Sequence, residues 1–183
     1  MSEKERVISL EKEDNKFEIE KPFNRACLGE SGVWVLLGKK SNSTYVCLNV
    51  GKTVDIGREI LYDVSCLKYV KEPNDASRNY INQFGEDCGF NWKNNETQEC
   101  LYPYIAKNFS NLTFVVAFES TDKDEKKDVE KGIADRYKAL FWRNGKAFEK
   151  SKDKLDLSKR RSFENLDEFC DDLKEYFRSR KKQ

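Results

Sequence analysis

The sequence predicts an α+β fold, and three observations support this class. Residues 33–50 contain two apolar, β-branched-rich runs separated by a turn-like segment, which is the pattern of a β-hairpin. Residues 54–70 carry apolar side chains at helical spacing. Residues 112–118 form a further apolar strand, and residues 163–177 form an amphipathic helix. At 183 residues the chain is long enough for one domain with additions.

The helix predicted after the hairpin carries functional side chains on one face. Asp55 lies near its start and is the candidate N-cap. Arg58 and Tyr62 are four residues apart, so they lie one above the other on the helix surface. We therefore expect both side chains beside the end of the second hairpin strand.

Small, aromatic and charged residues follow one another in a particular order along this region. A glycine and an aromatic residue open the first strand, a Val-Gly pair follows in the second, and the arginine and tyrosine come one helical turn apart. The positions are Gly32, Trp34, Asn49, Gly51, Arg58 and Tyr62. Their order resembles the GIY-YIG endonuclease family. The resemblance implies a small three-stranded antiparallel sheet flanked by helices, with residues 112–118 as the third strand.

The same resemblance implies a metal site. In this family a helix after the third strand carries a metal-binding glutamate, and an asparagine further on braces the site. Here the corresponding residues are Glu130, in the segment 129–137, and Asn144. A single carboxylate ligand from the protein is enough to hold Mg²⁺ or Mn²⁺, because such a cation keeps several bound waters and also binds oxygens of the substrate. Without the resemblance, Glu130 follows the charged run 122–128 and is typical of a solvated helix face.

The arginine of the resemblance is offset by one residue. Arg58 lies closer to Gly51 than is usual in the family, so Glu59 occupies the expected arginine position. A loop that is one residue shorter would restore Arg58 to this role, and its spacing to Tyr62 favours that alternative over loss of the arginine. In the role that the resemblance implies, the planar guanidinium would bind a phosphate oxygen and stabilise the transition state.

Both signature tyrosines of the family are replaced, by Trp34 and Asn49. Neither side chain can accept a proton from an attacking water, so Tyr62, Lys52 or metal-bound water would have to act as the base. Trp34 also has a plain structural interpretation as an aromatic side chain of the core. Loss of turnover is therefore the alternative to an active enzyme.

Composition excludes several classes of active site. The chain contains no histidine, which rules out histidine acid–base catalysis, Ser-His-Asp triads and zinc sites with histidine ligands. The net charge is +1, so phosphate binding would need a local cluster of basic residues. Residues 146–161 are rich in lysine and arginine and form either such a cluster or a solvated loop. The six cysteines contain no CxxC pair, which argues against a zinc ribbon or a thioredoxin-type site.

Hydropathy and cysteine usage indicate the compartment. The N-terminal sequence lacks the apolar core of a signal peptide. No run approaches the roughly 18 apolar residues of a membrane span. Cys47 and Cys66 fall within apolar patterns and are typical of buried thiols in a reducing compartment. We expect a cytoplasmic protein that does not contact a membrane.

Three parts make up the predicted organisation. Residues 1–29 form an N-terminal extension with a strand candidate at 16–20. Residues 30–150 hold the GIY-YIG-like domain, with an insertion at about 72–111 whose asparagines and aromatics either bind exposed bases or pack inward. Residues 151–183 form a basic loop and the C-terminal amphipathic helix.

Together these features predict a divalent-metal-dependent endonuclease, a hydrolase that cuts DNA. The alternative is a GIY-YIG-fold module that binds nucleic acid or protein without turnover. Convergence of Arg58, Tyr62 and Glu130 on one open surface would favour the enzyme. A Trp34 side chain that fills the space between them would favour the module.

Overall fold

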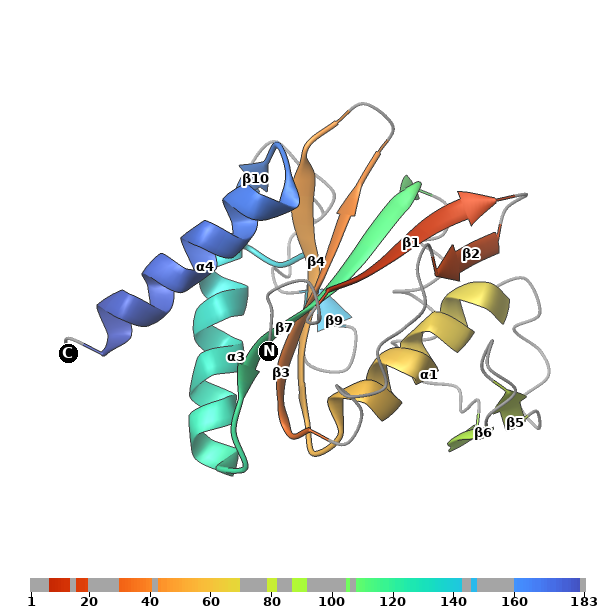
Figure 1. Ribbon diagram of the computed structural model, residues 1–183, viewed down its shortest axis with the longest axis horizontal. Helices are drawn as coiled ribbons and strands as arrows, with labels where there is room; N and C mark the ends of the chain where they lie inside the picture. Colours follow the sequence, from red (N-terminus) through yellow and green to blue (C-terminus); the bar gives the residue numbers. More distant parts are fainter. Residues whose placement is uncertain are drawn as a thin grey trace.

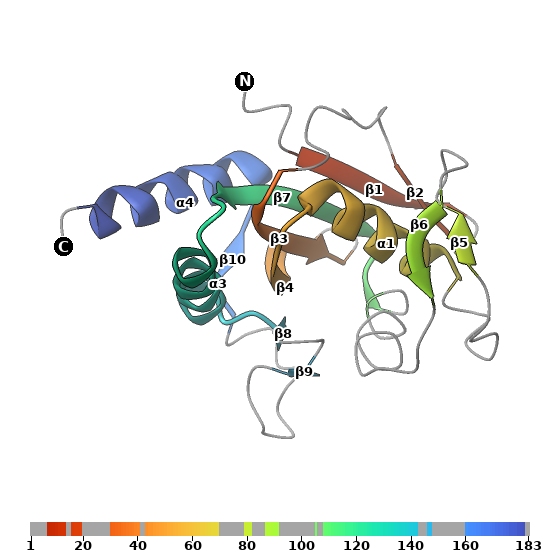
Figure 2. The same ribbon diagram turned by 90° about the horizontal axis from the view of Figure 1, so that it is seen from below.

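The computed structural model describes residues 7–13, 16–19, 30–40, 43–69, 79–81, 87–91, 105, 108–142, 146–147 and 160–181. Its fold is α+β, as the sequence predicts, with a curled sheet that has helices on both faces (Figures 1 and 2). Among these residues no helix is long and apolar enough to cross a membrane. Asn144 lies outside the described residues, and so does the side chain of Tyr62.

The centre of the fold is a hairpin followed by a helix, a strand and a second helix. The strands are β1 (Val7–Glu13), β2 (Lys16–Ile19), β3 (Gly32–Lys39), β4 (Tyr45–Thr53), β5 (Asn79–Ile81), β6 (Asp87–Asn91), β7 (Asn111–Glu119), β8 (Phe141–Trp142), β9 (Lys146–Ala147) and β10 (Ser162–Phe163). The helices are α1 (Ile56–Tyr69), α3 (Lys123–Tyr137) and α4 (Leu166–Arg180). The predicted hairpin, third strand and helices, and the strand candidate at 16–20, are confirmed.

Five strands form the antiparallel centre of the main sheet, in the order β2-β1-β7-β3-β4, and the short strand β10 pairs antiparallel with β4 as well. Strands β4, β3 and β7 are neighbours, and they are the three strands that the sequence predicts. The predicted three-stranded sheet is nevertheless too small, because β1 and β2 extend it beyond β7 and β8 joins parallel to β4. Ile8, Leu10 and Phe17 are buried, so the segment predicted as an extension contributes to the core.

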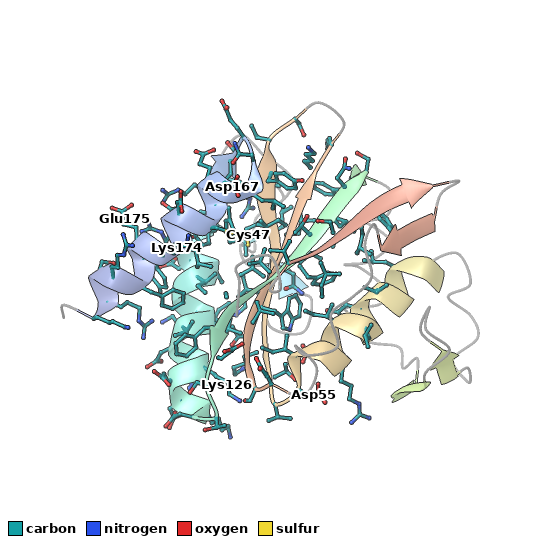
Figure 3. The ribbon with its side chains drawn as sticks, viewed as in Figure 1. Cys47, Asp55, Lys126, Asp167, Lys174 and Glu175 are labelled. Atoms are coloured by element: carbon teal, nitrogen blue, oxygen red, sulfur yellow. The ribbon has the colours of Figure 1, made fainter. Side chains whose placement is uncertain are left out.

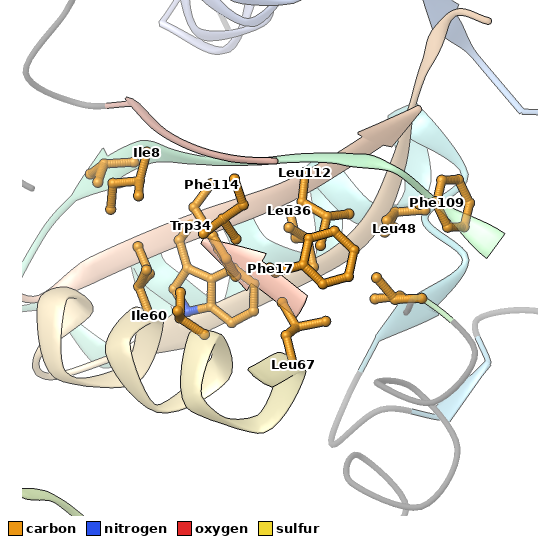
Figure 4. Close-up of a cluster of buried hydrophobic side chains, with 14 of the residues drawn as sticks. Ile8, Phe17, Trp34, Leu36, Leu48, Ile60, Leu67, Phe109, Leu112 and Phe114 are labelled. Carbon is orange, nitrogen blue, oxygen red and sulfur yellow. The ribbon is translucent and has the colours of Figure 1, made fainter. Parts of the chain in front are cut away.

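Side chains that alternate along β3 divide the core into two halves. Trp34 and Leu36 point to the face covered by α1, where they pack in one apolar cluster (Figure 4). Val33 and Val35 point to the opposite face, which α3 and α4 cover. Figure 2 shows α1 on one side of the sheet and α3 with α4 on the other. A site at the end of β4 is therefore within reach of helices from both faces.

Side-chain caps determine where α3 and α4 begin. Asp122 Oδ1 accepts hydrogen bonds from the backbone N–H groups of Asp124 and Glu125, both at 2.8 Å. Asn165 Oδ1 accepts one from the N–H of Glu168 at 2.9 Å. Caps of this kind stabilise a helix by about 1 kcal/mol each. The Asp122 cap therefore determines that α3 begins directly after β7, and the Asn165 cap determines where α4 begins.

A charged cluster joins α3 and α4 to the segment before β10. Asp172 of α4 is buried and accepts hydrogen bonds from Arg136 Nε and Nη2, both at 3.0 Å, and from Arg161 Nη2. Arg160 is buried and donates from Nη1 to the carbonyl of Lys138 at 2.5 Å. Both described arginines of the predicted basic segment therefore bind internal acceptors.

Candidate functional site

The two signature strands meet where Trp34 faces Gly51 across the hairpin. The indole lies on the α1 side, buried, with its ring edge toward Phe114 at a centroid distance of 5.7 Å. A Cβ at Gly51 would collide with this ring, so only glycine lets the indole lie flat against β4. Trp34 is thus an aromatic side chain of the core, which is one of the two interpretations that the sequence allows.

Asn49, at the second position where the family resemblance expects a tyrosine, is also buried. Its Oδ1 accepts a hydrogen bond from the N–H of Val50 at 3.0 Å, so the side chain turns back onto its own strand. The ladder between β3 and β4 shifts register next to this residue, between Leu36 and Leu37. The Asn49 side chain thus satisfies a backbone N–H group next to the irregular part of the β3–β4 pairing. This hydrogen bond is structural and indicates no catalytic role.

Glu130 and Lys52 form an ion pair on the α3 side of the sheet. Lys52 Nζ lies 3.0 Å from Glu130 Oε2, and the side chains are 33% and 7% exposed. Lys52 points to this face because it follows Gly51 on β4. Glu130 is therefore not the solvated surface charge that the local sequence suggests. Its carboxylate lies against the end of β4, with a lysine ammonium beside it.

Lys126 adds a second cation to the same region. It lies one helical turn before Glu130 on α3 and is buried. Its Nζ donates hydrogen bonds to Ser31 Oγ at 2.5 Å and to the carbonyl of Thr53 at 3.1 Å. Figure 3 shows Lys126 on α3 and Asp55 before α1 at the same end of the molecule. The ammonium thus ties α3 to the start of β3 and the end of β4.

Glu59 approaches from α1. Burial raises the pKa of its carboxyl group, and the Glu130 carboxylate raises it further. Hydrogen bonding to Thr53 and Trp34 and the charge of Lys52 oppose this rise only in part, and the indole contact lies outside ordinary hydrogen-bond geometry. A carboxylate therefore faces the site from the position where the family resemblance expects an arginine.

Arg58 lies on a different face of α1 from Glu59, because successive helical residues are about 100° apart. Its side chain is exposed, and its backbone N–H donates to Asp55 Oδ1 at 2.9 Å. The predicted cap at Asp55 is confirmed by this bond. The residue one turn after Glu59 is Asp63, which is buried. Glu59 therefore lies near enough to Glu130 for the two carboxyl groups to interact electrostatically, whereas the Arg58 side chain is exposed.

We call the group that meets at the end of β4 the ion-pair site. Its members are Lys52, Lys126 and Glu130, and Glu59 of α1 lies near enough to respond to the charges of Lys52 and Glu130. Lys52, Glu59 and Glu130 are among the residues that the sequence singles out, whereas the charged run around Lys126 is typical of hydrated surface. The available signal was the four-residue spacing from Lys126 to Glu130, which places both on one helix face.

The ion-pair site does not fit a resident Mg²⁺ or Mn²⁺. Among the described residues no group of three or more His, Cys, Asp or Glu side chains is arranged to hold a metal. The ammonium of Lys52 already neutralises Glu130, and Lys126 brings another positive charge to the same strand end. A divalent cation would have to displace Lys52 against this electrostatic field.

Comparison with known proteins gives no independent assignment. No family model, no curated protein and no solved structure matches the chain. The likeness to the GIY-YIG family therefore depends on the ordered residues of this sequence, and its functional consequences are proposals.

Proposed function

We propose that the chain is a GIY-YIG-like domain that binds nucleic acid at the ion-pair site without cleaving it. The observation that carries this proposal is the 3.0 Å ion pair between Lys52 and Glu130. In a metal-dependent nuclease the equivalent carboxylate must be available to a cation. Here that carboxylate is buried and already neutralised.

Two further features support loss of turnover. Trp34 and Asn49 cannot accept a proton, and both are buried in structural roles. Glu59 places a carboxyl group where the resemblance expects a guanidinium, and a carboxyl group cannot supply the fork of N–H donors and the positive charge that would stabilise the transition state. Each of these differences removes a component of catalysis, and none of them prevents binding.

Positive charge at the end of β4 supports nucleic acid as the ligand. Lys52 is one-third exposed, and Arg58 is exposed on the first turn of α1, directly after β4. Lysine and arginine near a phosphate backbone increase affinity by releasing counterions, and the gain decreases with added salt. Because these contacts read no base edge, we expect binding with weak sequence preference.

A binding titration tests this proposal. A fluorescein-labelled DNA duplex is titrated with the full chain by fluorescence anisotropy at several salt concentrations. Lys52→Gln/Arg58→Gln, measured at a temperature where thermal unfolding shows it to be folded because Glu130 loses its cation, should weaken binding by about tenfold and reduce the salt dependence by about two phosphate contacts. The matched control is Lys174→Gln/Lys181→Gln, which removes the same charge from α4 and should leave the affinity unchanged. Absent or salt-insensitive binding, or equal effects of both pairs, would overturn the proposal.

The endonuclease remains a second candidate because of one specific observation. Glu130 lies on the helix after the third strand and reaches the end of β4, which is where the resemblance expects the metal ligand. If a substrate phosphate drew Lys52 away, Glu130 could bind a cation. In that case wild-type protein would nick plasmid DNA with Mn²⁺, and Glu130→Gln would abolish the nicking.

A further inference from the structure

A groove lies between α4 and the sheet, and none of the residues that line it belongs to the ion-pair site. Its volume is about 430 Å³, within the range of about 300–1,000 Å³ that is typical of small-molecule sites. Val7 of β1 and Val115 and Ala117 of β7 line the sheet side, and Leu173 and Phe177 line the α4 side. Val7, Ala117 and Phe177 are only partly buried against the core. Part of the apolar surface of the sheet beside α4 is therefore accessible.

Phe177 gives this groove a fixed wall. Its ring stacks on Phe118 of β7 at a centroid distance of 5.4 Å and an interplanar angle of 17°. Tyr176 packs against the same ring at 5.1 Å. Aromatic contacts on two sides restrict the rotamer of Phe177, so the groove is formed before a ligand arrives.

Basic side chains line the groove along α4. Lys174, Arg178 and Lys181 follow at spacings of four and three residues, so they lie on one stripe of the helix. Lys174 Nζ is 3.2 Å from Asp171 Oδ1, but both side chains are well exposed and such a surface pair is weak. Figure 3 shows Lys174 on α4. One long side of an apolar groove therefore carries an excess of positive charge.

We propose that this groove binds a long-chain carboxylate, that is, a fatty acid. The alkyl chain lies on the apolar floor between Val7 and Ala117, and the carboxylate binds Arg178 and Lys181 at the basic side. The Arg178 guanidinium matches a carboxylate in shape and can donate two parallel hydrogen bonds. A neutral chain would leave the basic side unused, and a cationic one would be repelled. The inference goes beyond the proposed nucleic-acid function, because it uses none of the residues of the ion-pair site.

Calorimetric titration with dodecanoate below its micelle concentration tests the proposal. We expect saturable binding with one ligand per chain. Affinity should rise from octanoate to decanoate to dodecanoate, by up to about fourfold for each added CH₂. Dodecyltrimethylammonium, which has the same chain and the opposite charge, should bind at least about tenfold more weakly. No saturable binding, or equal binding of the cation, overturns the inference.

Substitutions in the groove test whether dodecanoate binds there. Ala117→Trp fills the floor and should weaken dodecanoate binding by more than about tenfold. Arg178→Gln/Lys181→Gln should weaken dodecanoate binding by about fivefold. Both side chains are exposed, so this double variant should fold normally. The matched control, Lys127→Gln/Lys131→Gln, removes the same charge from exposed positions of α3 and should have no effect. Thermal unfolding shows whether each variant is folded. If Ala117→Trp does not fold, the comparison of the two double charge variants tests the location of the site. Equal affinity of Arg178→Gln/Lys181→Gln and wild type, or equal loss in the α3 control, overturns the inference.

Discussion

Lys52 and Glu130 differ in burial, and this difference determines what each contributes. Glu130 has little contact with water, whereas Lys52 is one-third exposed at the end of β4. A buried charge that loses its partner is costly, while an exposed one is solvated. Lys52 therefore supplies the positive charge that allows the Glu130 carboxylate to remain buried.

This asymmetry predicts unequal effects of two substitutions. Lys52→Met leaves the Glu130 carboxylate buried without its cation and should cost about 2–4 kcal/mol. Glu130→Gln leaves Lys52 free to reach water and should cost about 1 kcal/mol. Urea unfolding at neutral pH measures both. If Glu130→Gln proved the more damaging change, Lys52 would not be the group that holds Glu130 in place.

Glu59 predicts a stability effect with a defined pH dependence. Because burial raises its pKa in the folded protein, the folded state binds the proton more tightly than the unfolded chain does. Stability then falls as pH rises from 4.5, the ordinary value, through the folded pKa. Glu59→Gln removes this penalty, so the variant should be more stable than wild type at pH 7. The difference should shrink on acidification, and a constant difference across this range would contradict the assignment.

Gly51 and Trp34 should show strong coupling. Gly51→Ala places a methyl group against the indole and should cost about 1–3 kcal/mol. In a Trp34→Leu background the ring is gone, so the same change should cost much less. A double-mutant cycle by chemical denaturation measures this difference. Additive losses would mean that the indole does not restrict position 51.

At the scale of elements, Asp172 connects two helices and the strand β10. Burial alone would raise the pKa of Asp172, but hydrogen bonds from Arg136 and the charges of Arg136 and Arg161 outweigh it and hold the pKa below 3.8. A depressed folded pKa stabilises the protein at pH values above the unfolded pKa. That contribution is lost as pH falls through the folded value.

Asp172→Asn should therefore destabilise the protein by about 2 kcal/mol at neutral pH, because two arginines lose their anion. Below about pH 4 the variant should lose less stability on further acidification than wild type, since the titrating carboxylate is gone. Urea unfolding at neutral and at acidic pH measures both effects. Parallel pH profiles for the two proteins would show that another carboxylate is responsible.

At the scale of the whole molecule, local patterns predict the elements better than their assembly. Apolar runs predict β3, β4 and β7, which are buried on both faces, and helical periodicity predicts α1 and α4, which each bury one face. The pairing of β1 with β7 depends on contacts between residues about a hundred positions apart, which no local pattern encodes. The sheet is larger than predicted for this reason.

The ion-pair site shows the same limit. The family resemblance implies that Lys52 and Glu130 belong to one region, and the structure brings them together. Whether Arg58 or Glu59 faces inward depends on where α1 begins, and the Asp55 cap determines that. Spacing alone could not choose between them. Lys126 was missed because one residue of a charged run is buried while its neighbours are exposed.

We propose that the ion-pair site binds DNA without cleaving it, and a plasmid nicking assay in Mn²⁺ distinguishes this from nuclease activity. Wild-type protein is compared with Glu130→Gln under conditions where anisotropy shows the DNA to be bound. The account predicts intact supercoiled plasmid with both proteins, because Lys52 and not a metal neutralises Glu130. Metal-dependent nicking by wild type that disappears in Glu130→Gln would contradict it.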